Sequence, residues 1–206
     1  MLRSRASGAC ECFPVDETSR AGVQGQDMEP FVIRQAVSTD IPTLIELDHS
    51  YSTDHVWQMA LQPGSPGVEV AFREVRLPRP MRVRYPRSVE RLADEWTDRS
   101  VVIVGEVDER VAGYLALAPA PAPDAVWVTD LVVDPAFRRR GLGSRLLAES
   151  IGWARARSQS RLFFEMQSKN YPAIQLAQKL GFVFSGYSDF FYPNEDISLF
   201  FSFDLG

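Results

Sequence analysis

The chain has 206 residues, of which 45% are hydrophobic and 24% charged, and its 22 basic and 27 acidic residues give a net charge of −5. This length and composition suit one globular domain with a well-buried core, and no apolar run approaches the roughly 20 residues that a membrane-spanning helix needs. The acidic balance argues against a nucleic-acid partner, because phosphate contacts demand a basic surface, so the composition predicts a cytoplasmic enzyme without nucleic-acid or membrane partners.

Residues 1–29 differ from the rest of the chain in composition. They mix Ser, Gly, Gln, Asp and Arg with almost no aliphatic periodicity, and they lack the apolar stretch of about 7–15 residues found in secretory signals. Cys10 and Cys12 are the two cysteines of the chain, too few for a disulfide framework and, without a nearby His, a poor metal site. We therefore expect a disordered tail and no bound metal. The folded domain would then be residues 30–206, with Met28 as a candidate start of translation.

The folded domain is predicted to open on a short strand and a helix. Phe31 to Arg34 reads as the strand, and Ser38-Thr39-Asp40 supplies an N-cap for a helix that continues to Asp48. Residues 51–90 are harder to place. Strand-like stretches at 55–59 and 68–77 flank a Pro- and Gly-rich segment there, a pattern that predicts an additional hairpin.

Strands and helices alternate through the second half of the chain. Strands at 101–107 and 111–118 form a hairpin, and a buried strand at 125–133 follows a proline-rich loop. Apolar residues then recur every three to four positions, which predicts a helix with one buried face as far as about Arg157. The remaining predicted elements are a strand at 161–166, a helix at 170–180, and strands at 182–190 and 197–203.

The junction between the strand at 125–133 and the following helix reads Arg138-Arg139-Arg140-Gly141-Leu142-Gly143-Ser144. Glycine allows close approach of the backbone to a ligand. The first four N–H groups of a helix lack internal acceptors, at the end where the dipole favours an anion, and arginines add bidentate positive charge. The stretch therefore predicts a pyrophosphate cradle. It is not a P-loop, because no Lys follows the glycines, nor a dinucleotide fingerprint, because Leu146 stands where a third glycine would fall.

Two motifs in this half resemble those of the GNAT acyltransferases. Arg138, Gly141 and Gly143 match the acetyl-CoA-binding pattern Arg/Gln-x-x-Gly-x-Gly/Ala. Downstream, Asn170, followed by Ala173-Ile174 and closed by Leu180-Gly181-Phe182, is similar to the second signature of the family. The resemblance covers roughly residues 30 to 205.

The resemblance implies an α+β fold with α/β/α layers. Helices would flank a central mixed, mostly antiparallel sheet of six to seven strands, splayed between its fourth and fifth strands. It further implies acetyl-CoA as co-substrate, no metal, and an amine acceptor, and it allows a homodimer. The residues that the resemblance assigns to the cofactor are Leu131, Val132, Val133, Arg138, Arg139, Arg140, Gly141, Leu142, Gly143, Ser144 and Asn170.

Three further stretches resemble the streptothricin acetyltransferase branch of the family. These are the insertion at 51–90, the ending from Tyr192 to Phe201, in which an acidic loop precedes an aromatic final strand, and Glu165-Met166-Gln167 at the end of a strand. They imply an acyltransferase of EC class 2.3.1 that acetylates a primary amine of a small molecule by direct attack in a ternary complex. Acetylation of a protein or peptide N-terminus or lysine is an alternative. A non-catalytic acyl-CoA-binding sensor is a second alternative.

The chemistry requires a base for the amine and an acid for the departing thiolate. By the resemblance Asp130 is the best-placed base, with Glu165 as runner-up. The family usually carries the acid as a Tyr on the helix after Asn170, but this chain has Ala177 there. The candidates that replace it are water and three tyrosines, of which we expect Tyr192 to act rather than Tyr171 or Tyr187.

Overall fold

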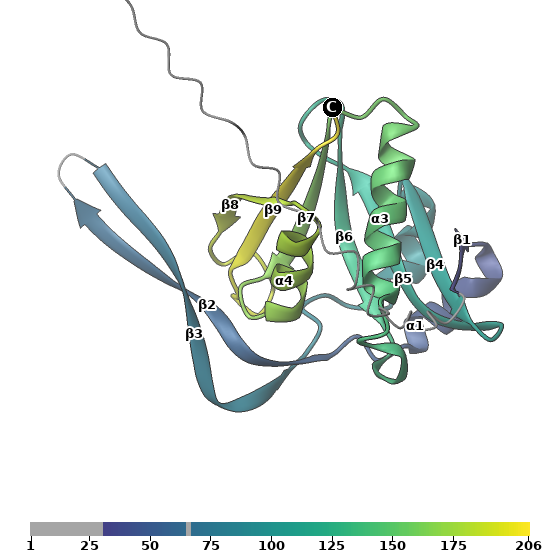
Figure 1. Cartoon of the computed structure of the whole chain (residues 1–206), viewed down its shortest axis with the longest axis horizontal. Helices are drawn as coiled ribbons and strands as arrows, with labels where there is room; N and C mark the ends of the chain where they lie inside the picture. The colour runs from purple at the N-terminus through teal and green to yellow at the C-terminus, as the bar shows by residue number, and fades with distance from the viewer. Residues whose placement is uncertain (1–30, 65–66) are drawn as a thin grey trace, which may run out of the picture.

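A seven-stranded sheet with the order β1-β4-β5-β6-β7-β9-β8 forms the centre of the fold (Figure 1). The structure is a computed structural model that describes residues 31–64 and 67–206, so the predicted tail of residues 1–29 lies outside the described residues. Within the described part, β6 and β7 pair in parallel and the other neighbours antiparallel, which confirms the predicted mixed sheet. The strands are β1 (Val32–Gln35), β4 (Val101–Val107), β5 (Arg110–Pro119), β6 (Ala125–Val133), β7 (Arg161–Gln167), β8 (Val183–Ser188) and β9 (Ser198–Asp204).

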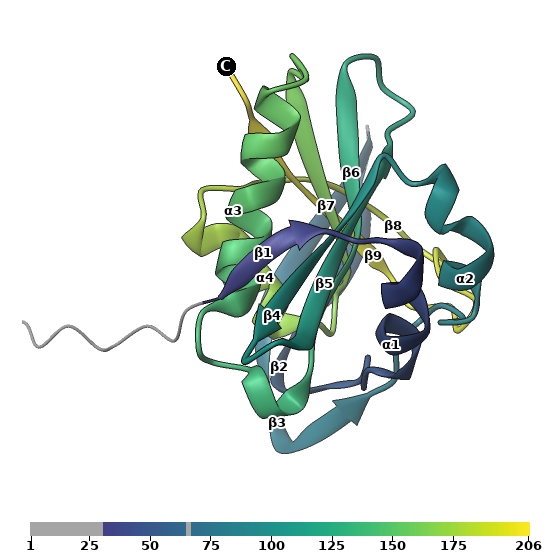
Figure 2. The same ribbon diagram turned by 90° about the vertical axis from the view of Figure 1, so that its right-hand side faces the viewer.

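Helices cover both faces of this sheet (Figure 2). On one face α3 (Leu142–Arg155) and α4 (Tyr171–Lys179) bury apolar side chains, among them Leu146 and Ile174, against β5, β6 and β7. On the other, α1 (Ile41–Glu46) and α2 (Arg91–Glu95) pack with Tyr114 and Val132 in a second buried cluster. The predicted α/β/α layering is therefore confirmed. None of these helices has the length and apolar character needed to cross a bilayer.

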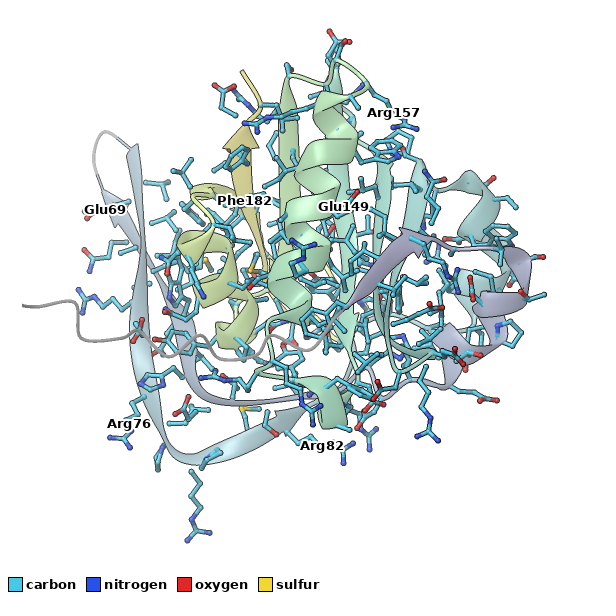
Figure 3. All side chains as sticks on the ribbon, turned by 45° about the vertical axis from the view of Figure 1, so that its right-hand side comes forward. Glu69, Arg76, Arg82, Glu149, Arg157 and Phe182 are labelled. Carbon is cyan, nitrogen blue, oxygen red and sulfur yellow. The ribbon has the colours of Figure 1, made fainter. Side chains whose placement is uncertain are left out.

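Charged side chains mark the outer surfaces of the elements (Figure 3). Glu149 on α3 and Arg76 are exposed, whereas Phe182, just after α4, is buried. This division follows the helical spacing of α3, in which Leu142, Leu146, Leu147 and Ala154 are buried as the sequence predicts.

The predicted hairpin is present and longer than the sequence indicates. Strands β2 (Tyr51–Gly64) and β3 (Gly67–Val83) form a separate two-stranded sheet that extends beyond β8 (Figure 1). Trp57 attaches it to the body, because its backbone N–H donates to the carbonyl of Ser168 at 2.9 Å and its ring packs against Phe184 and Phe201.

Short helices account for most differences from the predicted elements. The N-terminal helix starts as the 3-10 helix η1 (Ser38–Asp40), and α1 ends at Glu46 rather than Asp48. No side chain of this predicted cap holds the N-terminus of α1. The Asp40 carboxylate instead accepts the N–H of Val37 and binds Arg34 at 2.7 Å. The five-residue α2 was not predicted, since one and a half turns leave no helical periodicity in the sequence.

A bulge in β6 determines where its side chains point. The register with β5 runs from Val128↔Leu117 to Asp130↔Ala116, so Thr129 is an extra residue on β6. After the bulge, Asp130 and Val132 face the side of α1 and α2, while Leu131 packs toward α3 and α4. The pairing of β6 with β7 also stops at Val128↔Phe164. These are the fourth and fifth strands of the sheet in chain order, so the predicted splay is confirmed.

Candidate active site

A cavity of about 890 Å³ lies where β6 and β7 diverge. Its walls come from the C-terminal end of β6, the start of α3, one side of α4, the end of β7, and the stretches 49–52 and 85–87 together with Tyr192. The three predicted catalytic residues Asp130, Glu165 and Tyr192 line it. So do ten of the predicted cofactor residues, namely Leu131, Val132, Val133, Arg138, Arg139, Gly141, Leu142, Gly143, Ser144 and Asn170.

The backbone at the start of α3 has the geometry of an anion cradle. Gly141 has φ +96° and Arg139 has φ +66°, both in the left-handed region that glycine adopts most readily. The first intrahelical bond in this turn runs from the N–H of Arg145 to the carbonyl of Gly141 at 3.1 Å. The preceding N–H groups therefore have no acceptor within the helix and are directed out of its N-terminus. A Cβ at Gly141 would have no neighbour closer than Phe31 at 4.0 Å, so the protein leaves open space beside this residue.

Two arginines of the cradle, Arg138 and Arg140, make different contacts. Arg138 donates to the carbonyls of Val133 (2.7 Å), Asp48 (3.1 Å) and Ser50 (2.7 Å), and so ties the start of β2 to the end of β6. The guanidinium of Arg140 lies over the ring of Phe137, 5.5 Å from its centroid. Of the other predicted cofactor residues, Asn170 caps α4, its side chain accepting the N–H of Ala173 at 3.2 Å.

Two buried carboxyl groups stand on the α1/α2 side of the splay. Tyr85 donates a hydrogen bond to one oxygen of Asp130, and the hydroxyl of Thr129 donates to the other at 2.7 Å. Burial raises the pKa of Asp130 to about 7, and the charge of Glu165 adds to this increase. Burial also raises the pKa of Glu165, although its ion pair with Arg87 opposes that shift.

Arg87 closes the gap between the two strands. Its guanidinium pairs with Glu165 of β7 and donates to the carbonyl of Thr129 of β6 at 3.0 Å. That carbonyl belongs to the bulge, beyond the last paired residue of the ladder between β6 and β7. Arg87 thus links β6 and β7 just past the point where they cease to pair.

The three tyrosines considered for the thiolate acid are found in different surroundings. Tyr192 is buried at the cavity wall, with its hydroxyl 3.5 Å from Oγ of Ser198, and burial together with the charge of Glu165 raises its pKa. Tyr171 stacks on His55 and donates to Glu74 at 3.0 Å. Tyr187 packs edge-on against Phe72. Among the described residues Tyr171 and Tyr187 are not part of the cavity wall, and Ala177 is fully buried in the core.

Several cavity residues carry no signal in the sequence. Tyr51 donates from its hydroxyl to Oε1 of Gln167 at 2.9 Å, and Tyr85 and Arg87 meet the carboxyl groups described above. All three come from the stretch 51–90, in which the resemblance assigns no individual residue a role, and an alignment of acceptor-site sequences is the signal that would find them. His49, which we did not assign to the site, also lies at the cavity; it is buried, its Nε2 is 3.1 Å from the hydroxyl of Tyr114, and burial lowers its pKa.

Comparisons with known proteins agree with this geometry. Residues 70–182 match the acetyltransferase (GNAT) family. The chain is 26% identical over 162 residues to streptothricin acetyltransferase from Streptomyces lavendulae, a match that covers 76% of this chain and 83% of that protein. The crystal structure of nourseothricin acetyltransferase superposes with a TM-score of 0.71 at 24% identity, over 85% of this chain and 99% of that one. The acetyl-CoA complex of a Bacillus anthracis protein assigned as a streptothricin acetyltransferase gives a TM-score of 0.67 at 18% identity, over 85% and 98% of the two chains.

Proposed function

This chain belongs to the acetyltransferase (GNAT) family, and on that premise we propose that it transfers the acetyl group of acetyl-CoA to a primary amine of a small molecule. The proposal rests on one observation: a single cavity is lined both by the N-terminal cradle of α3 and by the buried carboxyl groups of Asp130 and Glu165. The similarity to streptothricin acetyltransferase over 76% of the chain supports a small-molecule acceptor. The acetyl-CoA bound to a structural relative supports the donor.

The donor would enter from the α3/α4 side. Its pyrophosphate would accept hydrogen bonds from the N–H groups of the first turn of α3, beside the open space at Gly141. The pantetheine arm and the acetyl carbonyl would bind the backbone of Leu131 to Val133, since this stretch of β6 lies beyond the last pair with β7. Holding donor and acceptor together in this way can contribute about 7–11 kcal/mol to catalysis.

The acceptor would enter from the α1/α2 side, where Asp130 and Glu165 face the splay. Asp130 accepts a proton from the ammonium group, directly or through water, and the neutral amine attacks the thioester carbon. A C–N bond forms and the C–S bond breaks. The nitrogen gives up its second proton, which replaces the proton that the departing thiolate takes from its donor, and Asp130 releases the ammonium proton to solvent. No covalent intermediate on the protein is required, because the thioester is electrophilic enough for direct attack in a ternary complex.

Tyr192 is the proposed donor of the proton that the thiolate takes. Its hydroxyl lies at the cavity wall and, like an ordinary tyrosine hydroxyl, carries its proton at neutral pH. Ala177, at the usual family position, has no proton to donate. Tyr51 is the alternative proton donor, since its hydroxyl lies at the same cavity wall and comes from β2.

A thiol-release assay with acetyl-CoA tests the proposal. The panel contains diamines, amino acids, aminoglycosides, streptothricin and lysine-containing peptides. We expect turnover with one or more of the small amines and little with the peptides, because three large side chains, those of Tyr85, Arg87 and Tyr192, line the acceptor end of the cavity. Peptide acetylation without small-amine acetylation would favour a protein acetyltransferase. Binding of acetyl-CoA without any turnover would favour a sensor.

A further inference from the structure

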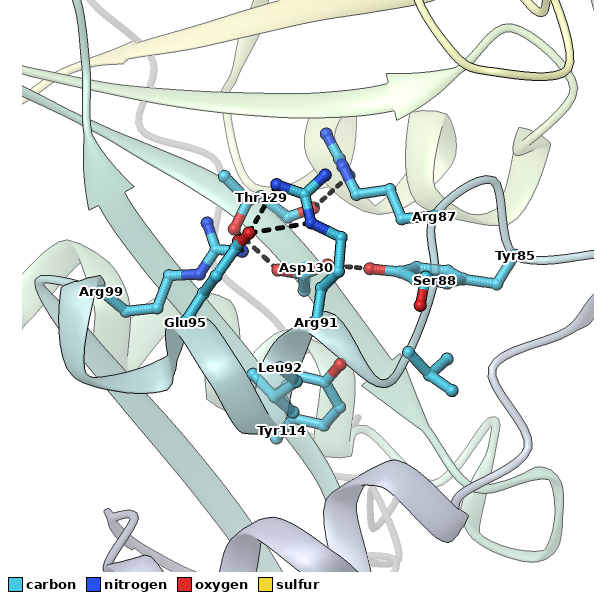
Figure 4. A pocket seen from close by; sticks show the side chains of 11 residues that line it. Tyr85, Arg87, Ser88, Arg91, Leu92, Glu95, Arg99, Tyr114, Thr129 and Asp130 are labelled. Carbon is cyan, nitrogen blue, oxygen red and sulfur yellow. Dashed lines mark hydrogen bonds and ion pairs between the residues drawn. The ribbon is translucent and has the colours of Figure 1, made fainter.

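A second, smaller cavity of about 140 Å³ adjoins the proposed acceptor site (Figure 4). It lies between α2 and β6, on the α1/α2 side of the sheet. Four residues line both cavities, namely Tyr85, Arg87, Thr129 and Asp130. A molecule whose amine is held at Asp130 would therefore reach the small cavity with an adjacent part of its own structure.

Three arginines from the segment around α2 line this small cavity. Arg87 precedes α2, Arg91 begins it, and Arg99 follows η2 (Trp96–Asp98). Arg87 donates to the carbonyl of Thr129, whereas Arg91 is bonded to Glu95 (Figure 4). We call the three arginines the guanidinium cluster. The carboxylate of Glu95 in the cavity wall is shared by two of them. Nε of Arg91 donates to its Oε1 at 2.8 Å, and Nη2 of Arg99 lies 3.5 Å from its Oε2.

Arg99 has unused hydrogen-bonding capacity. Its side chain is 17% exposed, and its Nε–H is buried with no hydrogen-bond acceptor in the described part of the chain. A buried donor without an acceptor is costly, and the great majority of such groups in proteins are paired. The guanidinium group of Arg99 is therefore short of acceptors, and a carboxylate in the cavity would supply one to its terminal nitrogens.

The charge balance indicates what kind of acceptor fits. The guanidinium cluster contributes three positive charges, and Glu95 and Glu165 offset two of them. One positive charge remains once Asp130 has taken the proton of the substrate ammonium, which matches a single negative charge on the substrate. A doubly charged phosphate would be repelled by the carboxylates that already stand in the wall, whereas a planar carboxylate suits guanidinium forks.

The geometry points to the guanidinium cluster as a binding site for a carboxylate of the acceptor, so that the substrate is an aminocarboxylate such as a free amino acid. The inference rests on the proposed function, since it places the reacting amine at Asp130. The carboxylate would receive hydrogen bonds from the terminal nitrogens of Arg99 and Arg91. The amine would lie across the wall that the two cavities share.

The test compares acceptors that differ only in the carboxylate. L-Lysine and cadaverine carry the same two amines, and L-phenylalanine and phenethylamine form a second such pair. We expect kcat/KM to be about 10-fold to 100-fold higher for the amino acid of a pair, the range of one or two charge-assisted hydrogen bonds. The variant Arg99→Gln should abolish this preference by raising KM for the amino acid, with kcat/KM for its decarboxylated partner unchanged within about 2-fold.

Two controls separate a local effect from loss of the fold. Arg110→Gln removes an exposed arginine at the start of β5 and should leave both acceptors unaffected. Arg91→Gln, whose side chain is 64% exposed, provides the same test if Arg99→Gln does not fold. Equal or better turnover of the decarboxylated acceptors, or equal losses for both members of a pair in the variants, would overturn the inference while leaving amine acetylation intact. Absence of turnover with every amine would instead overturn the proposed function and, with it, the inference.

Discussion

The activity is expected to depend on the protonation state of Asp130. Its carboxyl group must be ionised to take a proton from the amine, yet burial raises its pKa to about 7. We therefore expect kcat/KM to rise with pH through an apparent pKa near 7. In Asp130→Asn the rate should fall by about 10²–10⁴-fold, the range for a positioned base, and this limb of the pH profile should disappear. A profile that keeps its limb in the variant would assign the base to Glu165 or to another group.

The raised pKa of Asp130 affects stability in the opposite direction, because stability falls as pH rises. Because the folded-state pKa of Asp130 is raised above its ordinary value of 3.8, the folded protein binds more protons than the unfolded chain between about pH 4 and pH 7. The stabilisation is complete below pH 4 and is lost as pH rises toward 7. In Asp130→Asn the melting temperature should fall less steeply over this interval. Glu165 shifts in the same direction, so the slope is reduced rather than abolished.

Tyr192 and Tyr51 offer a direct comparison of two hydroxyl groups at one cavity wall. If Tyr192 protonates the thiolate, Tyr192→Phe should lower kcat by about 10²–10⁴-fold, and calorimetry should find acetyl-CoA binding nearly unchanged. Tyr51→Phe should then change kcat only a few-fold. The reverse order would assign the proton to Tyr51. A rise only in KM for the amine would mean that Tyr192 binds the acceptor instead.

Individual site residues differ in how far the sequence could predict them. The glycines and arginines of the cradle are adjacent in sequence, so a short motif locates them. The contacts of Arg138 with the carbonyls of Asp48 and Ser50 depend on how β2 starts beside β6, which no local pattern contains. The direction of Asp130 depends in the same way on the bulge at Thr129.

At the scale of elements, the junction of β6 and α3 depends on the backbone conformation of Gly141. Its φ of +96° is strained for any other residue, so Gly141→Val should distort the cradle and place a branched side chain where the phosphate would bind. We expect calorimetry to find CoA binding weakened at least about 100-fold, since several charge-assisted hydrogen bonds would be lost.

Gly143 provides the matched control for that variant. A Cβ there would meet Leu176 at 3.5 Å, an ordinary contact, and the residue lies within α3 without a positive φ. Alanine also satisfies the family motif at this position, so Gly143→Ala should bind CoA within a few-fold of the unchanged chain. Unchanged CoA affinity in Gly141→Val would remove the cradle assignment.

Long elements with a clear period were predicted well, and short ones were not. The strand at 125–133 and the buried face of α3 follow from residue pattern alone. The hairpin was predicted at 55–59 and 68–77, but β2 and β3 run from Tyr51 to Val83, because pairing between the two strands extends them past their most strand-like residues. The helix α2 has no such pattern, and its position comes from packing of Leu92 against the sheet.

At the scale of the whole molecule, the two faces of the sheet correspond to the two entrances of the proposed reaction centre. The α3/α4 face carries the cradle and the α1/α2 face carries the carboxyl groups, and the splay of β6 from β7 connects them. The family resemblance predicts the splay and the candidates Asp130, Glu165 and Tyr192. The partners of these residues were not predictable, because they come from the stretch 51–90 and depend on contacts between residues far apart in the chain, such as Arg87 with Glu165.

The attachment of the β2/β3 hairpin also belongs to this scale, since the first residues of β2 form part of the cavity wall. Trp57 packs against Phe72 of β3 and against Phe184 and Phe201 of the main sheet, with ring centroids 5.7–6.4 Å apart. Trp57→Ala should destabilise the protein by about 2–4 kcal/mol through the lost ring and should make the hairpin more sensitive to limited proteolysis. Trp57→Phe should cost much less, because it keeps an aromatic ring and removes an indole N–H that is buried without an acceptor in the described chain. Equal melting temperatures for Trp57→Ala and the unchanged protein would mean that the hairpin is held by other contacts, and the Tyr51 end of the cavity wall would then not depend on this aromatic cluster.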